Sequence, residues 1–255
     1  MIRVSGTRRN RPRRAPIPTA KSGSGSPTTT TTPTRTSTTV ADPARRGLLV
    51  TFEGPEGSGK STLIRGLAGR LEALGRPVLT TREPGGTPVG ERIRSVLLDP
   101  SLPELCPETE LLLMVASRAQ LVREVVLPAL ADGRIVLCDR YADASVAYQG
   151  AGRELGRARV DALNDFALAG AAPDLTLLCL LPPAAGRRRF GGRDPDRLER
   201  ESAAFHERVY DAYRAMAGSG DPRFRVLDAT APPDGQLEQA VTHLRGLEHD
   251  LLMGL

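Results

Sequence analysis

The sequence predicts an α/β domain in which a parallel β-sheet carries helices on both faces. Short apolar runs rich in Leu and Val alternate with longer stretches of helical periodicity. This is the pattern of strands that are buried on both faces and joined by helices. The first apolar run ends at a glycine-rich loop that opens a helix. Hydrophobic residues make up 40% of the 255 residues, enough for a sizeable core.

The elements follow in order along the chain. The apolar runs predict strands at 48–52, 77–81, 135–138, 175–181 and 225–227. The helical patterns lie at 60–74, 87–98, 108–131, 197–217 and 235–252. Gly75 and Gly133 mark the ends of the first and third helices. Glu108 and Glu110 occupy the first turn of the third helix, where the helix dipole favours acids.

Residues 1–46 differ in composition from residues 47–255, which we expect to form the folded domain. The first 46 residues are rich in Thr, Pro, Ser and Arg, and they lack the apolar side chains needed to offset the entropy of ordering. We therefore expect a disordered, basic extension. It holds ten basic residues and one acidic residue, whereas residues 47–255 hold 25 basic and 29 acidic residues. A mildly acidic domain argues against nucleic acid as the main partner.

Two further features bear on the cellular compartment. No apolar run approaches the roughly 20 residues needed to span a bilayer, so we expect no membrane partner. The three cysteines, Cys106, Cys138 and Cys179, form no CxxC pair. This pattern is typical of a reducing cytoplasm.

The loop after the first strand is the most specific motif. Residues 54–61 match G-x-x-x-x-G-K-[ST] between a strand and a helix, which is the context a phosphate-binding loop requires. Its glycines allow close backbone approach, and the helix N-terminus behind it favours negative charge. Lys60 can reach the β- and γ-phosphates, and the Ser61 hydroxyl can bind Mg²⁺. The loop predicts binding of a nucleoside triphosphate, but it does not distinguish a kinase from a GTPase, motor or synthetase.

Three other segments could complete a site. Asp139 ends the third strand. A carboxylate there could hold Mg²⁺, or it could be a polar residue that only ends the strand. Arg140 follows it and is well suited to bind a second phosphate group. Met114 and Arg118 share one face of the long helix, and periodicity alone favours a core Met beside a surface Arg. An Arg-rich stretch, 187–193, contains two glycines and could close over transferring phosphates or form a solvated turn.

Taken together, these motifs resemble the thymidylate kinase family. The matching segments are 52–62, the Arg-Glu-Pro-Gly-Gly-Thr sequence at 82–87, the Asp-Arg-Tyr sequence at 139–141, the Tyr-Gln-Gly sequence at 148–150 and the Asp-Arg-Leu-Glu sequence at 196–199. The resemblance covers roughly 47–250. It implies a P-loop nucleoside-monophosphate-kinase fold, a homodimer, and phosphoryl transfer from ATP to dTMP, giving ADP and dTDP for dTTP synthesis.

The resemblance also implies roles for individual residues. It places ATP on Gly54, Pro55, Glu56, Gly57, Ser58, Gly59, Lys60, Ser61 and Thr62. It places dTMP on Glu83, Pro84, Met114, Arg118, Arg140, Ser145 and Tyr148, with Arg140 on the monophosphate, Arg118 on the thymine carbonyl and Tyr148 excluding ribose. It assigns Mg²⁺ to Ser61, Glu56, Asp139 and Glu199. It assigns catalysis to Lys60, Asp139, Arg140, Arg188 and Arg193. Because the loop has Glu56 rather than Arg, the resemblance is to the bacterial subtype that carries its arginine in the lid.

The acceptor side departs from the family pattern. Met114 stands where a Phe usually stacks on thymine, and Ala144 stands where a hydroxyl is usual. Leu180 replaces an Asp, and Ala184 replaces a Glu. Two alternatives therefore remain open, which are a kinase for a different or modified pyrimidine monophosphate and a non-catalytic nucleotide-binding paralogue.

Overall fold

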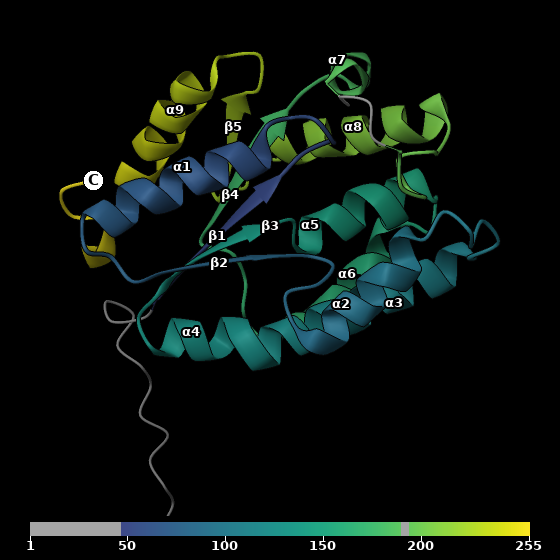
Figure 1. Cartoon of the computed structure of the whole chain (residues 1–255), viewed down its shortest axis with the longest axis horizontal. Helices are drawn as coiled ribbons and strands as arrows, with labels where there is room; N and C mark the ends of the chain where they lie inside the picture. Colours follow the sequence, from purple (N-terminus) through teal and green to yellow (C-terminus); the bar gives the residue numbers. More distant parts are fainter. Residues whose placement is uncertain (1–46, 190–193) are drawn as a thin grey trace, which may run out of the picture. The chain divides into compact units, whose positions relative to one another are not determined.

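A computed structural model describes residues 47–189 and 194–255. The predicted extension, 1–46, lies outside the described residues. Figure 1 shows one sheet with helices on both sides. The strands are β1 (Leu48–Glu53), β2 (Val78–Arg82), β3 (Ile135–Asp139), β4 (Leu175–Leu180) and β5 (Phe224–Asp228). All neighbouring strands are parallel, in the order β2-β3-β1-β4-β5, which confirms the predicted fold class.

The helices are longer in total than the sequence patterns predicted. They are α1 (Lys60–Ala73), α2 (Pro88–Leu98), α3 (Pro107–Leu121), η2 (Val122–Val126), α4 (Leu127–Ala131), α5 (Ala142–Ser145), η3 (Val146–Gly152), α6 (Arg157–Leu168), α7 (Pro183–Arg188), α8 (Ala203–Ala217), α9 (Pro233–Arg245) and η4 (Asp250–Leu252). The predicted helix 108–131 is one continuous stretch with the π-helical segment η2 in its middle.

Two predicted helices have different bounds. The helix predicted at 197–217 begins at Ala203, because the Ser202 hydroxyl accepts the Phe205 N–H and caps α8 there. Before α8, the backbone N–H of Asp196 donates to the Glu199 carboxylate, and the backbone N–H of Glu199 donates to the Asp196 carboxylate. These hydrogen bonds favour a turn instead of a helix. The helix predicted at 235–252 ends at Arg245, and a short turn follows.

The core lies on both faces of the central strand β1. Leu48, Val50 and Phe52 pack with α1 and α9 on one face, and Leu49 packs with α4 on the other. A third apolar cluster joins β4 to α3, η3, α6 and α8. Because every strand is parallel, the carboxyl ends of β1, β2 and β3 meet at one edge of the sheet. The phosphate loop and the Asp139–Arg140 turn both start at that edge.

Candidate functional site

The phosphate loop joins β1 to α1 at the centre of the sheet. Gly54 has φ 133°, and a Cβ there would lie 2.3 Å from the carbonyl oxygen of Cys179 on β4. Only glycine therefore fits where the loop leaves β1. Gly59, with φ 93°, is the N-cap of α1, so the first N–H groups of the helix are left for a ligand.

Lys60 is held inside this loop. Its Nζ donates to the carbonyl oxygens of Gly54 and Pro55, both at 2.9 Å, and to Ser58 Oγ at 3.4 Å. The side chain is buried, and burial together with the nearby Arg140 charge lowers the pKa of Lys60. The loop carbonyls therefore stabilise an ammonium group whose charge burial disfavours.

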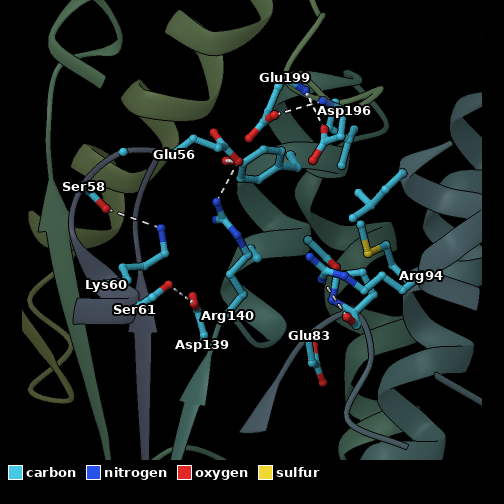
Figure 2. A pocket seen from close by; sticks show the side chains of 18 of the residues that line it. Glu56, Ser58, Lys60, Ser61, Glu83, Arg94, Asp139, Arg140, Asp196 and Glu199 are labelled. Carbon is cyan, nitrogen blue, oxygen red and sulfur yellow. Dashed lines mark hydrogen bonds and ion pairs between the residues drawn. The ribbon is translucent and has the colours of Figure 1, made fainter. Parts of the chain in front are cut away.

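Ser61 and Asp139 bring two oxygen ligands together. The residues lie on different elements, and Ser61 Oγ donates to Asp139 Oδ2 at 3.1 Å (Figure 2). The described residues contain no group of three His, Cys, Asp or Glu side chains that could hold a metal. Mg²⁺ usually takes one or two carboxylates and completes its octahedron with water and phosphate oxygens. The Ser61–Asp139 pair fits that kind of site.

Arg140 lies between the phosphate loop and the rest of the pocket. Its Nη1 donates to the Gly54 carbonyl at 2.9 Å, and its Nη2 donates to Glu56 Oε1 at 2.7 Å (Figure 2). The guanidinium also lies 4.9 Å from the Tyr148 ring centroid, and the Tyr148 hydroxyl donates to Glu56 Oε1 at 2.6 Å. Burial opposes the charge of Glu56, but Arg140 and Lys60 lower its pKa below the ordinary value.

Arg118 and Glu83 form a buried ion pair beyond Arg140. Arg118 Nη2 and Nε lie 2.7 Å and 2.8 Å from Glu83 Oε2, and the two side chains are 1% and 3% exposed. Arg118 also donates to Ser145 Oγ, Asn164 Oδ1 and the Tyr141 carbonyl. All five of its N–H groups thus have protein acceptors. The interpretation of Arg118 as a surface residue, which periodicity favoured, is wrong.

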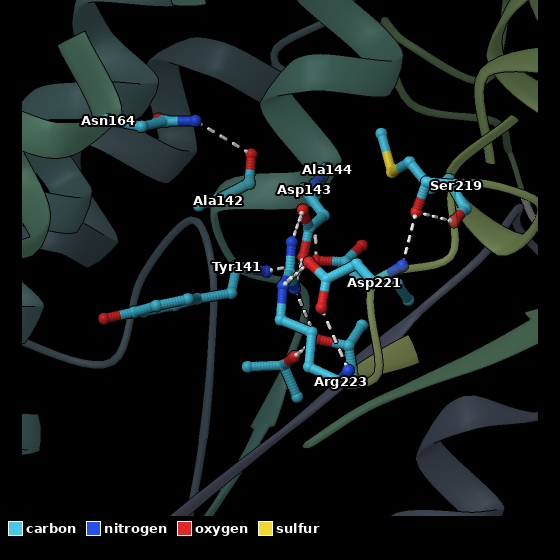
Figure 3. Close-up of polar contacts among 12 residues, drawn as sticks. Tyr141, Ala142, Asp143, Ala144, Asn164, Ser219, Asp221 and Arg223 are labelled. Carbon is cyan, nitrogen blue, oxygen red and sulfur yellow. Dashed lines mark hydrogen bonds and ion pairs between the residues drawn. The ribbon is translucent and has the colours of Figure 1, made fainter. Parts of the chain in front are cut away.

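The turn that carries Ser145 is anchored from two sides (Figure 3). Arg223 donates to both carboxylate oxygens of Asp143, at 2.6 Å and 2.8 Å, and Asn164 Nδ2 donates to the Ala142 carbonyl at 3.1 Å. Asp143 is buried, and Arg223 is about one-quarter exposed. A bidentate Arg–carboxylate pair of this kind fixes orientation as well as position.

The phosphate loop, the Asp139–Arg140 turn and the Arg118–Glu83 pair line one cavity of about 670 Å³. This volume is within the usual range for a small-molecule site. The predicted residues that line it are Glu56, Gly57, Ser58, Gly59, Lys60, Ser61, Thr62, Glu83, Pro84, Met114, Arg118, Asp139, Arg140, Ser145, Tyr148 and Glu199. The donor motif therefore shares its cavity with the residues expected to hold an acceptor.

Comparison with known proteins agrees with this geometry. A family model described as thymidylate kinase matches residues 52–241. The thymidylate kinase of Deinococcus radiodurans is 52% identical over 190 residues, covering 74% of this chain and 92% of the relative. The thymidylate kinase of Pseudomonas fluorescens is 49% identical over 199 residues, covering 78% and 94%.

The chain belongs to the thymidylate kinase family. The thymidylate kinase of Pelotomaculum thermopropionicum is 48% identical over 187 residues, which supports the same conclusion. The predicted family and enzyme class, a nucleotide kinase, are thereby confirmed.

Among the described residues, three predicted site residues of this thymidylate kinase family member do not line the cavity. Gly54 and Pro55 contribute their carbonyl oxygens to Lys60 instead. Arg188 is exposed near the end of α7 and is absent from the cavity wall. Arg193 lies outside the described residues.

The cavity also contains residues to which the sequence analysis assigned no individual role. Arg94 and Leu98 belong to no recognised motif, Gln149, Asp196 and Leu198 belong to the motifs at 148–150 and 196–199, and Arg189 belongs to the Arg-rich stretch. Ala144, at the departure noted above, also lines the cavity. Arg94 Nη1 donates to the Pro84 carbonyl at 2.9 Å, so α2 places a cation beside one of the residues expected to bind dTMP. Arg94 lies four residues before the end of a predicted helix and belongs to no recognised motif, so no sequence signal pointed to it. Gln149 lies inside the recognised Tyr-Gln-Gly sequence, which could have pointed to it.

Helix α7 packs directly against the phosphate loop. A Cβ at Gly57 would lie 2.8 Å from the Gly186 carbonyl, and one at Gly186 would lie 2.6 Å from the Glu56 carbonyl. Arg189, which follows α7, donates to the carbonyls of Gly57 and Ala229, each at 3.2 Å. Among the residues described from the Arg-rich stretch, Arg189 is the one at the cavity.

Proposed function

We propose that this chain transfers the γ-phosphoryl group of ATP to dTMP, giving ADP and dTDP, as the names of its relatives indicate. The observation that carries the proposal is the continuity of one cavity from Lys60 and Ser61 to Arg118 and Tyr148. A phosphotransferase must hold its donor and acceptor in one water-poor space with their reacting oxygens in line. Arg140, which contacts both the Gly54 carbonyl and Glu56, lies where the two halves meet.

The chemistry needs positioned charge more than a nucleophilic side chain. The acceptor is a phosphate oxygen that is already anionic, so attack requires no general base. Lys60 and the N–H groups at the start of α1 would neutralise the donor phosphates, and Arg140 would hold the acceptor phosphate. Arg189 would add positive charge from the lid side, in keeping with the arginine-in-lid subtype.

At the other end of the cavity, the base would meet Met114, Arg118 and Ser145. The five N–H groups of Arg118 are engaged, so a contact to a thymine carbonyl would share a donor now given to Ser145 or Glu83. Tyr148 would pack beside the sugar with its hydroxyl held by Glu56.

Magnesium is part of the proposal. Ser61 and Asp139 are the residues that would hold it, with Glu56 and Glu199 nearby on the cavity wall. When bound, the ion would neutralise charge on the donor phosphates. Removal of divalent ions with EDTA should abolish turnover, and added Mg²⁺ should restore it.

We also propose a homodimer in a cytoplasmic setting. Helices α2, α3 and α6 pack side by side (Figure 1) and carry exposed large apolar side chains. These include Leu112 at 56% and Phe166 at 78% exposure, with Val89 and Val96 on α2. Exposed apolar side chains on neighbouring elements are typical of a protein interface. The three cysteines are free, as in a reducing compartment, and no helix within the described residues has the length and apolarity to cross a membrane.

A substrate panel tests the activity. ADP release would be measured with ATP and, separately, dTMP, dUMP, dCMP and dGMP. We expect turnover to be fastest with dTMP and to be lost in Lys60→Ala, whose fold is checked by circular dichroism. Turnover with another monophosphate but none with dTMP would refute the assignment. Tight ATP binding without any turnover would instead indicate a non-catalytic paralogue.

A further inference from the structure

Tyr213 lies directly behind Arg140 and outside the cavity wall. It is on α8, which follows the Arg-rich stretch 187–193 in the chain, and its side chain is fully buried. Its hydroxyl lies 3.3 Å from Arg140 Nη1 and 2.8 Å from Glu53 Oε2. No recognised motif contains Tyr213, and a Phe would fill the same apolar space beside Tyr148.

The chemistry of the three groups fixes the direction of these hydrogen bonds. A guanidinium can only donate, so the Tyr213 oxygen accepts from Arg140. The phenolic hydrogen is then left to donate to Glu53. Tyr213 therefore connects the cation to a fully buried carboxyl group on the last residue of β1.

Glu53 in turn fixes the backbone next to Arg140. Its Oε1 accepts the N–H groups of Tyr141 at 2.7 Å and Ala144 at 3.2 Å. Arg140 itself has φ 67°, a left-handed conformation that a residue with a side chain keeps only when its surroundings impose it. The same buried carboxyl thus supports the backbone of the acceptor turn and, through Tyr213, the guanidinium.

These contacts also decide which edge of Arg140 can meet a ligand. Both hydrogens of Nη1 are used, one by the Gly54 carbonyl and one by Tyr213. One hydrogen of Nη2 is used by Glu56. The Nε–H donates to no other described residue, so it can donate to a phosphate, with the neighbouring Nη2 as a second donor on the same side of the group.

We propose that Tyr213 is a positioning residue for phosphate binding by Arg140, acting with Glu53 from behind the cavity. The proposal rests on the proposed function, because it takes the acceptor monophosphate as the group that Arg140 holds. Without the hydroxyl, Nη1 loses an acceptor and the guanidinium can rotate away from the bidentate orientation. The loss should fall on the phosphate and spare the nucleoside.

The test is Tyr213→Phe, compared with Tyr210→Phe as the matched control. Tyr210 lies three residues earlier on the same helix, is half-buried, and its ring has Arg214 6.0 Å away. Two quantities would be measured, the KM for dTMP and the inhibition constant of thymidine, which lacks the phosphate. We expect Tyr213→Phe to raise the KM for dTMP about tenfold, which is the loss typical of one hydrogen bond to a charged group. The inhibition constant of thymidine should stay within about twofold of the wild-type value. Tyr210→Phe should change neither.

Two results would overturn the proposal. An unchanged KM for dTMP in Tyr213→Phe would show that the hydroxyl does not position Arg140. Equal weakening of dTMP and thymidine would show that Tyr213 only supports the fold of the pocket. If Tyr213→Phe does not fold by circular dichroism, Glu53→Gln replaces it, because the amide can keep the oxygen that accepts from the turn and replaces the oxygen that accepts from Tyr213 with an NH2 group. The same dTMP-specific loss is expected there. Failure of the wild-type protein to phosphorylate dTMP would refute the proposed function, which is a separate outcome.

Discussion

Replacing Arg118 by Met should strongly destabilise the protein, because it leaves a buried carboxylate without its partner. Arg118 and Glu83 are 1% and 3% exposed, and their closest atoms are 2.7 Å apart. Glu83 Oε1 has no hydrogen-bond partner among the described residues, so Arg118 supplies the compensation for this charge. Removing one member of such a buried pair typically costs about 3–5 kcal/mol. This is a large share of a typical net stability of roughly 5–15 kcal/mol.

A second substitution should recover part of that loss. In the double variant Arg118→Met with Glu83→Gln, the unpaired charge is gone, so the two effects should not add. We expect a coupling free energy of about 2 kcal/mol or more, within the range for residues in contact. The pKa of Glu83 is already raised by burial, which Arg118 opposes. A carboxyl group with a raised folded-state pKa takes up a proton on folding. Arg118→Met should therefore regain stability as the pH falls.

Urea unfolding followed by far-UV circular dichroism measures these free energies, since the chain has no Trp for fluorescence. The control is Arg157→Met, which breaks the exposed i,i+4 pair with Asp161, where the side chains are 69% and 43% exposed. That variant should lose less than about 1 kcal/mol. Additive losses in the Arg118 and Glu83 variants, or a loss in Arg118→Met no larger than in Arg157→Met, would refute the reasoning.

Three shorter predictions concern the site and its pH dependence. Ala144→Ser should lower the KM for dTMP about tenfold by restoring a hydroxyl at the cavity wall, because a hydrogen bond to a charged group contributes about 1.5–3 kcal/mol. Steady-state kinetics with no change in KM would contradict this prediction. Burial, with Asp143 adding, raises the pKa of Glu53 from 4.5 to about 8. The folded state therefore holds an extra proton between these values. The free energy of unfolding should fall as the pH rises from about 4.5 to about 8, by at most about 1.4 kcal/mol per pH unit, and should level off above that. Urea titrations should show a flatter profile in Glu53→Gln. Arg189→Ala should lower kcat/KM for ATP about tenfold or more, whereas Arg188→Ala should have little effect. A coupled assay of ADP release measures both variants. Equal effects of the two substitutions would show that Arg189 is not the catalytic arginine of this segment.

The fold class and the donor loop could be predicted because their signals are local. A strand buried on both faces reads as an unbroken apolar run, and glycines in the loop follow from backbone geometry at each position. Gly54 illustrates this, since its φ of 133° and its closeness to β4 exclude any side chain. Helices without a clear apolar stripe or flanking signals, such as α6 and the short α7, gave too weak a pattern to be predicted.

The part of the cavity proposed to bind dTMP depends on contacts between residues that lie far apart in the sequence. Arg118 is reached by Glu83, Ser145 and Asn164, which lie 27 to 46 residues away along the chain. On its own helix it looks like an ordinary surface arginine. Its burial follows only from the packing of α3 against α6 and the turn before η3. Periodicity therefore failed where a polar side chain is buried by other polar side chains.

The two halves of the cavity are joined at the end of β1. The Gly54 carbonyl accepts from Lys60 and from Arg140, so one backbone oxygen just after β1 contacts both the cation proposed to bind ATP and the cation proposed to bind dTMP. Its neighbour Glu53 holds the acceptor turn from beneath. Two like charges brought this close repel each other unless acceptors such as Glu56 lie between or beside them. Glu56 therefore has an electrostatic role in the loop, because its negative charge lies near both Lys60 and Arg140 and reduces their mutual repulsion.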